Sequence, residues 1–299
     1  MSLLTECAFS TQISHAIYCM VVDTFSSSDI YFENKIFNTE IDLKAILDYF
    51  YYLDNKYCPL SIIIELLNNC NFNCGFCYIH NRNFSKQIDF NQLISILKIL
   101  IKNGLLHCVL TGGEIFMYPE FIKLYTFLKE NGVLVTLFTN LSLLNDNILT
   151  VLKKYKPFNV DVTLYGFNQK VFESTTNAKN VDCKSILKNI KLLKTNGINV
   201  SCKTLNVANN ICDFDVIKEW CKKENINFRY SSNLFSKYNG DFPIEYQINN
   251  NDIYYQKYKE KTLTKNNKKI NFSCSVSKHS LFLGYDLKIR PCWKFYNFG

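Results

Sequence analysis

The chain has 299 residues, of which 47 % are hydrophobic and 20 % are charged. These values are ordinary for a soluble globular protein, and the length suits one large α/β domain or two smaller ones. The formal net charge is +8, yet only three of the 34 basic residues are arginines and no dense basic block occurs. We therefore disfavour nucleic acid as a partner. No apolar run approaches the length of about 18 residues that a membrane helix needs, so we expect no membrane span.

Thirteen cysteines are a high count for a chain whose first ten residues lack the basic-then-apolar pattern of a signal peptide. The cysteines are scattered through apolar segments, apart from one cluster at residues 70–77. Disulfides form and persist in oxidising compartments, whereas this usage fits a reducing cytoplasm and a metal site. We therefore expect a cytoplasmic, metal-binding protein.

Residues 1–58 differ in pattern from the rest of the chain. Alternation of apolar residues predicts strands at 15–23 and 30–33, and helical spacing predicts a helix at 39–53. We interpret this segment as a small β/α unit without obvious chemistry. Its cysteines lack ligand spacing and are interpreted as core or surface thiols: Cys7, Cys19 and Cys58.

From residue 59 the pattern changes to alternating strands and helices. Six strands are predicted, at 60–67, 107–111, 133–139, 160–165, 198–207 and 227–231. Helices are predicted between them, at 89–102, 119–131, 144–155, 183–195 and 214–224. Such alternation is typical of an α/β fold with a parallel sheet or an open barrel, whose functional site lies at the carboxyl ends of the strands. Beyond Asn239-Gly240 the periodicity ends, and a short hairpin is predicted at 280–290, flanked by Cys274 and Cys292.

The first candidate site is the C-x3-C-x2-C loop of Cys70, Cys74 and Cys77, directly after the first of these strands. A structural zinc site is one alternative, but it needs a fourth ligand, and His80 would give a very cramped loop. Closely spaced thiolates favour an iron–sulfur cluster, of which three cysteines would leave one iron open to a substrate. The other cysteines of this region are interpreted as core or surface thiols: Cys108, Cys183, Cys202, Cys212 and Cys221.

The second candidate site is Gly112-Gly113-Glu114, directly after the next strand. A glycine pair at a strand end lets a ligand approach the backbone, and a carboxylate can accept hydrogen bonds from an ammonium group. Taken alone, the same three residues are equally consistent with a plain strand-to-helix turn.

Together these motifs resemble the radical S-adenosylmethionine (SAM) superfamily. The resemblance rests on residues 65–78 and on Thr111-Gly112-Gly113-Glu114, in this order and each after a strand. It implies a partial (β/α)6 TIM-like barrel in which Cys70, Cys74 and Cys77 hold a [4Fe-4S] cluster. SAM would bind the open iron through its amino and carboxylate groups.

The resemblance also implies roles for single residues around SAM. Phe76 corresponds to an aromatic residue near the adenine, and Gly112, Gly113 and Glu114 correspond to the motif that receives the methionine amino group. Thr163, in a Thr-x-x-Gly stretch at the fourth strand, corresponds to a further SAM contact.

Further along, the chain is similar to radical SAM enzymes with a C-terminal SPASM or twitch domain. Cys274 and Pro291-Cys292 fit the opening of its auxiliary-cluster region, although the chain stops at Gly299, before further cysteines of that kind. Either these two cysteines are cluster ligands or they are unligated thiols. The domains are accordingly expected at 1–58, 59–240 and 241–299.

The resemblance implies an enzyme that cleaves SAM with electrons from a flavodoxin- or ferredoxin-type donor. The resulting 5′-deoxyadenosyl radical would abstract hydrogen from a ribosomally made peptide or protein and lead to a thioether or carbon–carbon crosslink. This chemistry needs few acid–base residues, and we assign none. Residues 1–58 could recognise a leader peptide. The alternatives are sulfatase formylglycine maturation, small-molecule cofactor biosynthesis, and a non-catalytic metal-binding protein with the same fold.

Overall fold

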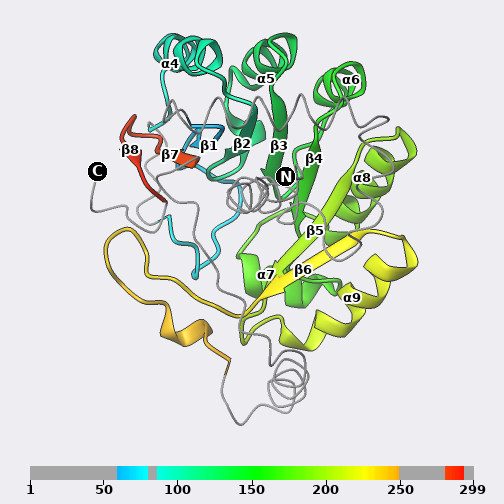
Figure 1. Ribbon diagram of the computed structural model, residues 1–299. Coiled ribbons are helices and arrows are strands. Elements are labelled where there is room, and N and C mark those ends of the chain that lie inside the picture. The colour runs from blue at the N-terminus through cyan, green and yellow to red at the C-terminus, as the bar shows by residue number, and fades with distance from the viewer. Residues whose placement is uncertain (1–58, 80–85, 249–279, 293–299) are drawn as a thin grey trace, which may run out of the picture.

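An eight-stranded sheet forms the centre of the protein (Figure 1). The computed structural model describes residues 59–79, 86–248 and 280–292. The strand order is β6-β5-β4-β3-β2-β1-β7-β8, and β1 to β6 are parallel to their neighbours. The predicted α/β class and partial TIM-like barrel are confirmed. The six parallel strands are β1 Ser61–Glu65, β2 His107–Thr111, β3 Leu134–Thr139, β4 Asn159–Thr163, β5 Val200–Leu205 and β6 Asn227–Ser231.

Helices cover the outer side of this sheet (Figure 1). Three of them end in the same way, with an asparagine followed by a glycine in the left-handed conformation, at Gly104, Gly132 and Gly197. Glycine adopts this conformation without a steric penalty, so each Asn-Gly pair ends its helix. The predicted helices are α4 Phe90–Lys102, α5 Phe121–Glu130, α6 Asp146–Lys154, α8 Cys183–Thr195 and α9 Phe214–Lys223.

The two faces of the strands differ in chemistry. One face is apolar and fully buried in the main core, where residues such as Ile64, Leu110 and Val162 are inaccessible to solvent. The opposite face carries polar residues at alternate positions and lines an internal cavity of about 690 Å³. Because successive side chains of a strand point to opposite faces, every second residue of β1 to β6 is available to this cavity. The inner face of the sheet thus presents both polar and apolar side chains to this cavity.

The predicted C-terminal hairpin is present and belongs to the same sheet. Strand β7 (Ser280–Leu283) pairs in parallel with β1, and β8 (Ile289–Arg290) pairs antiparallel with β7. The hairpin therefore extends the barrel sheet at its β1 edge. The strands and helix predicted within residues 1–58 lie outside the described residues, and so does Cys274.

One helix was not predicted from the sequence, α7 at Gln169–Thr176. It is only eight residues long, and its serine and threonine residues are weak helix formers. Asn168 caps its first turn by accepting a hydrogen bond from the amide of Lys170. Short 3-10 helices complete the described structure: η1 Ile115–Met117, η2 Ile211–Asp213 and η3 Ile244–Tyr246.

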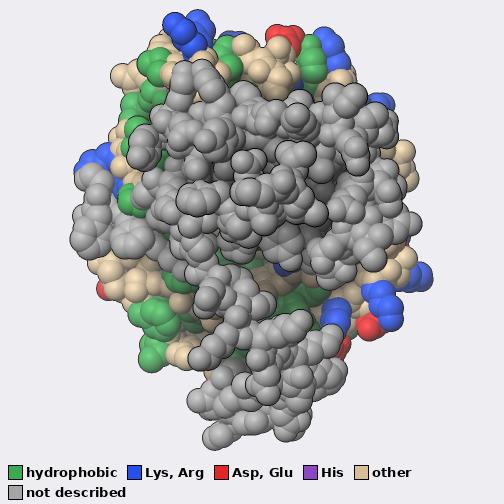
Figure 2. Space-filling view, viewed as in Figure 1, with side chains coloured by type: hydrophobic (Ala, Val, Ile, Leu, Met, Phe, Trp, Pro, Cys, Tyr) green, Lys and Arg blue, Asp and Glu red, His purple; other side chains and the backbone are tan. Residues whose placement is uncertain are grey.

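Figure 2 shows lysine and arginine side chains scattered singly over the described part of one face, without a continuous basic patch there. Among the described helices, none combines the length and the hydrophobicity required to cross a membrane.

Candidate active site

The three clustered cysteines lie on the wall of the internal cavity. Cys70, Cys74 and Cys77 are half-buried, and all three line the cavity together with the loop residues Phe72 and Phe76. The loop begins where β1 ends, at the carboxyl edge of the parallel strands. The sequence argument that places a site at this edge is therefore supported by the geometry.

Contacts from a distant element hold the cysteine loop. The amide of Asn73 donates a hydrogen bond to the carbonyl of Thr176 at 2.9 Å, and Phe72 packs edge-on against Phe172 at 5.4 Å between ring centroids. Both partners belong to α7. Within the loop, the amide of Cys77 donates to the carbonyl of Cys74 at 3.1 Å. The unpredicted helix α7 thus contributes to the position of the thiols.

The donor set fits an iron–sulfur cluster better than a single metal ion. Cys70 Sγ accepts hydrogen bonds from the amide of Phe72 at 3.4 Å and from Asn140 Nδ2 at 3.8 Å, as a thiolate ligand does. No group of three histidine, cysteine or acidic side chains within the described residues is arranged to hold one metal ion. Three thiols on a common cavity wall suit a larger, sulfur-bridged group. His80, the alternative fourth ligand, lies outside the described residues.

The glycine pair after β2 is required by contact with the cysteine loop. Gly112 has φ +138°, a conformation that side chains rarely adopt. A Cβ atom on Gly113 would lie 1.7 Å from the carbonyl oxygen of Asn69. The amides of Gly113 and Glu114 donate hydrogen bonds to the carbonyls of Leu67 and Asn69, each at 2.9 Å. The two candidate motifs therefore touch through their backbones, and both glycines also line the cavity.

Glu114 lies behind the cavity wall and does not line the cavity. Its carboxylate is fully buried and accepts hydrogen bonds from Thr139 Oγ1 at 2.6 Å and from the amides of Asn140 at 2.7 Å and Phe116 at 3.1 Å. Burial raises the pKa of Glu114 to about 7, and these hydrogen bonds oppose the rise. Asn140, which Glu114 fixes, in turn reaches Cys70 Sγ. The carboxylate thus connects the end of β3 to the cysteine loop.

The other predicted SAM contacts lie on the cavity wall. Phe76 is 4 % exposed and packs edge-on against Tyr165 and Tyr246, at 5.3 and 5.4 Å between ring centroids. Thr163 ends β4 and lines the same cavity. Aromatic side chains gathered in this way offer a surface for a flat heterocycle.

The remaining cysteines of the described region are separate from this cavity. Cys292 is half-buried and does not line the cavity, and its predicted partner Cys274 is outside the described residues. The interpretation of the others as core or surface thiols is confirmed. Cys212 is exposed, and four are buried: Cys108, Cys183, Cys202 and Cys221.

Three charged residues of the cavity were missed in the sequence. Lys203 Nζ and Arg229 Nη2 lie 3.0 and 2.8 Å from Asp161 Oδ2, and the Ser201 hydroxyl donates to Asp161 Oδ1 at 2.9 Å. The available signal was a charged residue in the middle of three neighbouring predicted strands. Such a residue is rarely buried without a partner, so the three together indicated a polar interior.

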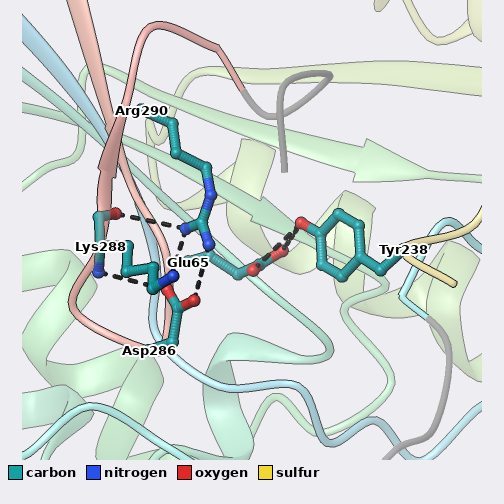
Figure 3. A network of polar contacts seen from close by, with 5 residues as sticks. All are labelled: Glu65, Tyr238, Asp286, Lys288 and Arg290. Carbon is teal, nitrogen blue, oxygen red and sulfur yellow. Dashed lines mark hydrogen bonds and ion pairs between the residues drawn. The ribbon is translucent and has the colours of Figure 1, made fainter. Parts of the chain in front are cut away.

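A second polar network lies beside the cysteine loop (Figure 3). Glu65, the last residue of β1, is fully buried and accepts hydrogen bonds from the hydroxyls of Tyr238 at 2.9 Å and Tyr78 at 3.2 Å. Burial raises the pKa of Glu65 to about 7, and the two tyrosine hydrogen bonds oppose the rise. Arg290, on the adjoining hairpin, pairs with Asp286 at 2.6 Å. The network joins β1, the hairpin and the segment after β6.

This segment, residues 232–248, also covers the cysteine loop directly. The amide of Tyr238 donates to the carbonyl of Tyr78 at 2.9 Å. A Cβ atom on Gly75 would lie 1.9 Å from the hydroxyl oxygen of Tyr246. Glycine at position 75 is therefore explained by the tyrosine ring that occupies the space beside it.

The fold, the cysteine loop and the adjoining glycine motif together define the class of this protein. Residues 64–219, just over half of the chain, match the Radical SAM superfamily. The chain belongs to this superfamily.

Two curated proteins of Bacillus subtilis are similar in sequence to part of this chain. The chain is 31 % identical over 142 residues to the antilisterial bacteriocin subtilosin biosynthesis protein AlbA of Bacillus subtilis, covering 47 % of this chain and 32 % of AlbA. It is 28 % identical over 95 residues to the sporulation killing factor maturation protein SkfB of the same organism, covering 31 % of this chain and 22 % of SkfB. The matched region thus spans a third or less of these curated relatives.

The fold of this chain is similar to that of a solved structure. The crystal structure of Streptococcus suis SuiB bound to precursor peptide SuiA matches with a TM-score of 0.64 and 19 % identity, covering 97 % of this chain and 73 % of that one. At this level of identity the match establishes the fold alone.

Proposed function

We propose that this chain is a radical SAM enzyme that modifies a ribosomally made peptide or protein. The observation that carries the proposal is the convergence of Cys70, Cys74 and Cys77 with Gly112 and Gly113 on one cavity at the carboxyl ends of the barrel strands. A [4Fe-4S] cluster and SAM, when bound there, supply a 5′-deoxyadenosyl radical. The protein contributes binding, orientation and exclusion of water.

The chain's own residues have distinct tasks in this proposal. The three thiolates hold the cluster, and Phe72 and Asn140 stabilise negative charge on Cys70 Sγ through their N–H groups. Phe76 and Thr163 contact SAM from the cavity wall, as does the backbone of Gly112-Gly113. Glu114 acts as a positioning residue, because its carboxylate bonds Thr139 and Asn140 instead of facing the cavity.

The substrate class is inferred from the relatives. AlbA and SkfB are named for the biosynthesis or maturation of peptide products, and SuiB was solved with a precursor peptide. A thioether or carbon–carbon crosslink is the corresponding product. The proposal includes an external flavodoxin- or ferredoxin-type electron donor in the cytoplasm. It also includes an auxiliary cluster with Cys274 and Cys292 among its ligands, and leader-peptide recognition by residues 1–58.

Anaerobic reconstitution tests the proposal. The chain is loaded with iron and sulfide, reduced with dithionite and supplied with SAM, and 5′-deoxyadenosine is measured by chromatography. We expect about four irons per radical-SAM cluster and formation of 5′-deoxyadenosine. Cys74→Ala should abolish the product, whereas Cys108→Ala, at a buried cysteine on the outer face of β2, serves as a matched control. Stoichiometric zinc without 5′-deoxyadenosine would instead indicate a metal-binding protein.

A further inference from the structure

The cavity contains a group of charged residues at some distance along the sheet from the cysteine loop. Asp161, Lys203 and Arg229 come from β4, β5 and β6, and all three line the cavity. The strand order puts β5 and β6 four and five strands away from β1, the strand that leads into the cysteine loop. Lys203 stands in register with Thr163 on one side and with Arg229 on the other.

The charges of this group do not balance. Lys203 and Arg229 both bind the same oxygen, Asp161 Oδ2, while Asp161 Oδ1 accepts from Ser201. His107, another cavity residue, is uncharged near neutral pH because burial lowers its pKa to about 4. Among the described residues that line the cavity, the lysine, arginine, aspartate and glutamate side chains are two cations, Lys203 and Arg229, and one carboxylate, Asp161. The group formed by Asp161, Lys203 and Arg229 therefore contains one more cation than carboxylate.

The two cations are partly exposed to solvent, whereas the carboxylate is not. The side chains of Lys203 and Arg229 are 27 % and 29 % exposed, whereas that of Asp161 is 0 % exposed. Lys203 Nζ also lies 3.1 Å from the centroid of the Phe138 ring, a contact that holds the ammonium at the cavity wall. An ammonium has three donors and can therefore bind a second acceptor while it remains bonded to Asp161.

An anion that enters the cavity meets both cations on the same wall. Asp161 binds both cations, so it orients them, but its single negative charge does not cancel their combined charge. A carboxylate that meets a partly desolvated ammonium and a guanidinium forms charge-assisted hydrogen bonds, which are stronger than neutral ones. The resemblance to radical SAM enzymes places the carboxylate of SAM on the iron beside the cysteine loop. The substrate is therefore the expected source of an anion at Lys203 and Arg229.

We propose that Lys203 and Arg229 bind a carboxylate of the peptide substrate, so that the enzyme selects a peptide carrying an acidic group close to the residue that reacts. The inference rests on the proposed function, because the peptide must enter the radical SAM cavity. The acidic group is either an aspartate or glutamate side chain or the C-terminal carboxylate of the peptide.

Three matched peptides test the proposal on the reconstituted full chain with saturating SAM and without reductant. They are acetyl-Ala-Glu-Ala-amide, acetyl-Ala-Gln-Ala-amide, and acetyl-Ala-Gln-Ala with a free C-terminus, and their binding is measured by calorimetry. We expect one of the two carboxylate peptides to bind about tenfold or more tightly than the neutral peptide. Whichever carboxylate peptide gains affinity identifies the source of the anion.

Variants assign the effect to the two cations. Arg229→Gln and Lys203→Met should reduce the affinity difference to less than about threefold, while Lys203→Arg retains the charge and most of the difference. Lys123→Met, at an exposed lysine paired with Glu120, is the matched surface control and should keep the full difference. Circular dichroism establishes that each variant is folded.

Two results would overturn the proposal. One is equal or undetectable binding of the three peptides by the folded wild-type protein. The other is a loss of SAM affinity in Arg229→Gln and Lys203→Met together with no carboxylate preference, which would assign the cations to SAM. Since no reductant is present, both results are independent of SAM cleavage. Failure of the proposed function would instead appear as absence of 5′-deoxyadenosine in the separate assay.

Discussion

The hydroxyl of Tyr238 donates a hydrogen bond to the buried carboxylate of Glu65 at 2.9 Å, although 173 positions separate the two residues. Glu65 ends β1, and the cysteine loop begins immediately after it. Tyr238 belongs to the segment after β6, and its hydroxyl points towards the carboxylate of Glu65 (Figure 3). The contact therefore joins the segment after β6 to the end of β1, next to the candidate cluster site.

Removal of this hydroxyl should destabilise the protein. Tyr238→Phe leaves a buried carboxylate with one hydrogen-bond donor fewer, which costs about 1–3 kcal/mol of unfolding free energy at pH 8. Urea denaturation of the metal-free protein measures the loss. Tyr155→Phe is the matched control, because Tyr155 donates to Glu130 at 2.6 Å in an exposed position. Equal stability losses in the two variants would contradict the importance of the buried contact.

The stability of the metal-free protein should fall as the pH rises. The pKa of Glu65 and that of Glu114 are both raised from 4.5 to about 7, so between these values the folded state holds protons that the unfolded state has released. The stabilisation is complete below about pH 4.5 and is lost as the pH passes 7. Denaturation midpoints between pH 5 and 8 measure this dependence.

Glu65→Gln should remove about half of this pH dependence and leave the part that arises from Glu114. Glu219→Gln, at an exposed position of α9, is the control and should behave like the wild type. A pH dependence in Glu65→Gln as steep as that of the wild type would show that Glu65 titrates normally.

The contact between the glycine motif and the cysteine loop should not tolerate a methyl group. In Gly113→Ala the new Cβ would lie 1.7 Å from the carbonyl oxygen of Asn69, so the backbone of one motif must move. We expect a loss of several kcal/mol, on the scale of severe steric substitutions, and a reduced iron content after reconstitution.

Gly132→Ala provides the comparison for this variant. Gly132 has φ +77°, but nothing lies within 4 Å of the position that a Cβ atom would occupy, so alanine there incurs only backbone strain of about 1 kcal/mol. The strain should leave the iron content unchanged. If Gly113→Ala bound iron as well as Gly132→Ala does, the tight contact would not determine the position of the thiols.

Asn140 should influence the reduction potential of a bound cluster. Its N–H group donates to Cys70 Sγ at 3.8 Å and favours the more negatively charged reduced state. If the bond is worth about 1 kcal/mol more in that state, Asn140→Ala should lower the potential by about 40 mV. Redox titration followed by electron paramagnetic resonance measures the shift, with Asn131→Ala at an exposed helix end as control. An unchanged potential in Asn140→Ala would contradict the hydrogen bond.

Much of the fold and of the site follows from local features of the sequence. Apolar periodicity and the Asn-Gly helix ends predict where six strands and five helices lie along the chain. Both signals depend on residues that are close in sequence. The cysteine spacing and the glycine pair likewise identify the cluster loop and its neighbour without knowledge of the fold. For the same reason α7 was missed, because its short and polar sequence carries little helical signal and its position depends on contacts with the cysteine loop.

The roles of the remaining site residues depend on the tertiary structure. Only the packing shows that Glu114 turns towards Thr139 and Asn140, that Gly113 meets Asn69, and that Tyr238 and Arg290 approach Glu65. The two cations beside Asp161 are visible in the sequence as isolated charges, but their convergence results from the register of β4, β5 and β6. The cysteine and glycine motifs identify the chemistry that the chain supports without knowledge of the fold, because ligand spacing is local. The tertiary structure decided which side chains face the cavity, because that depends on strand pairing between residues far apart in the chain.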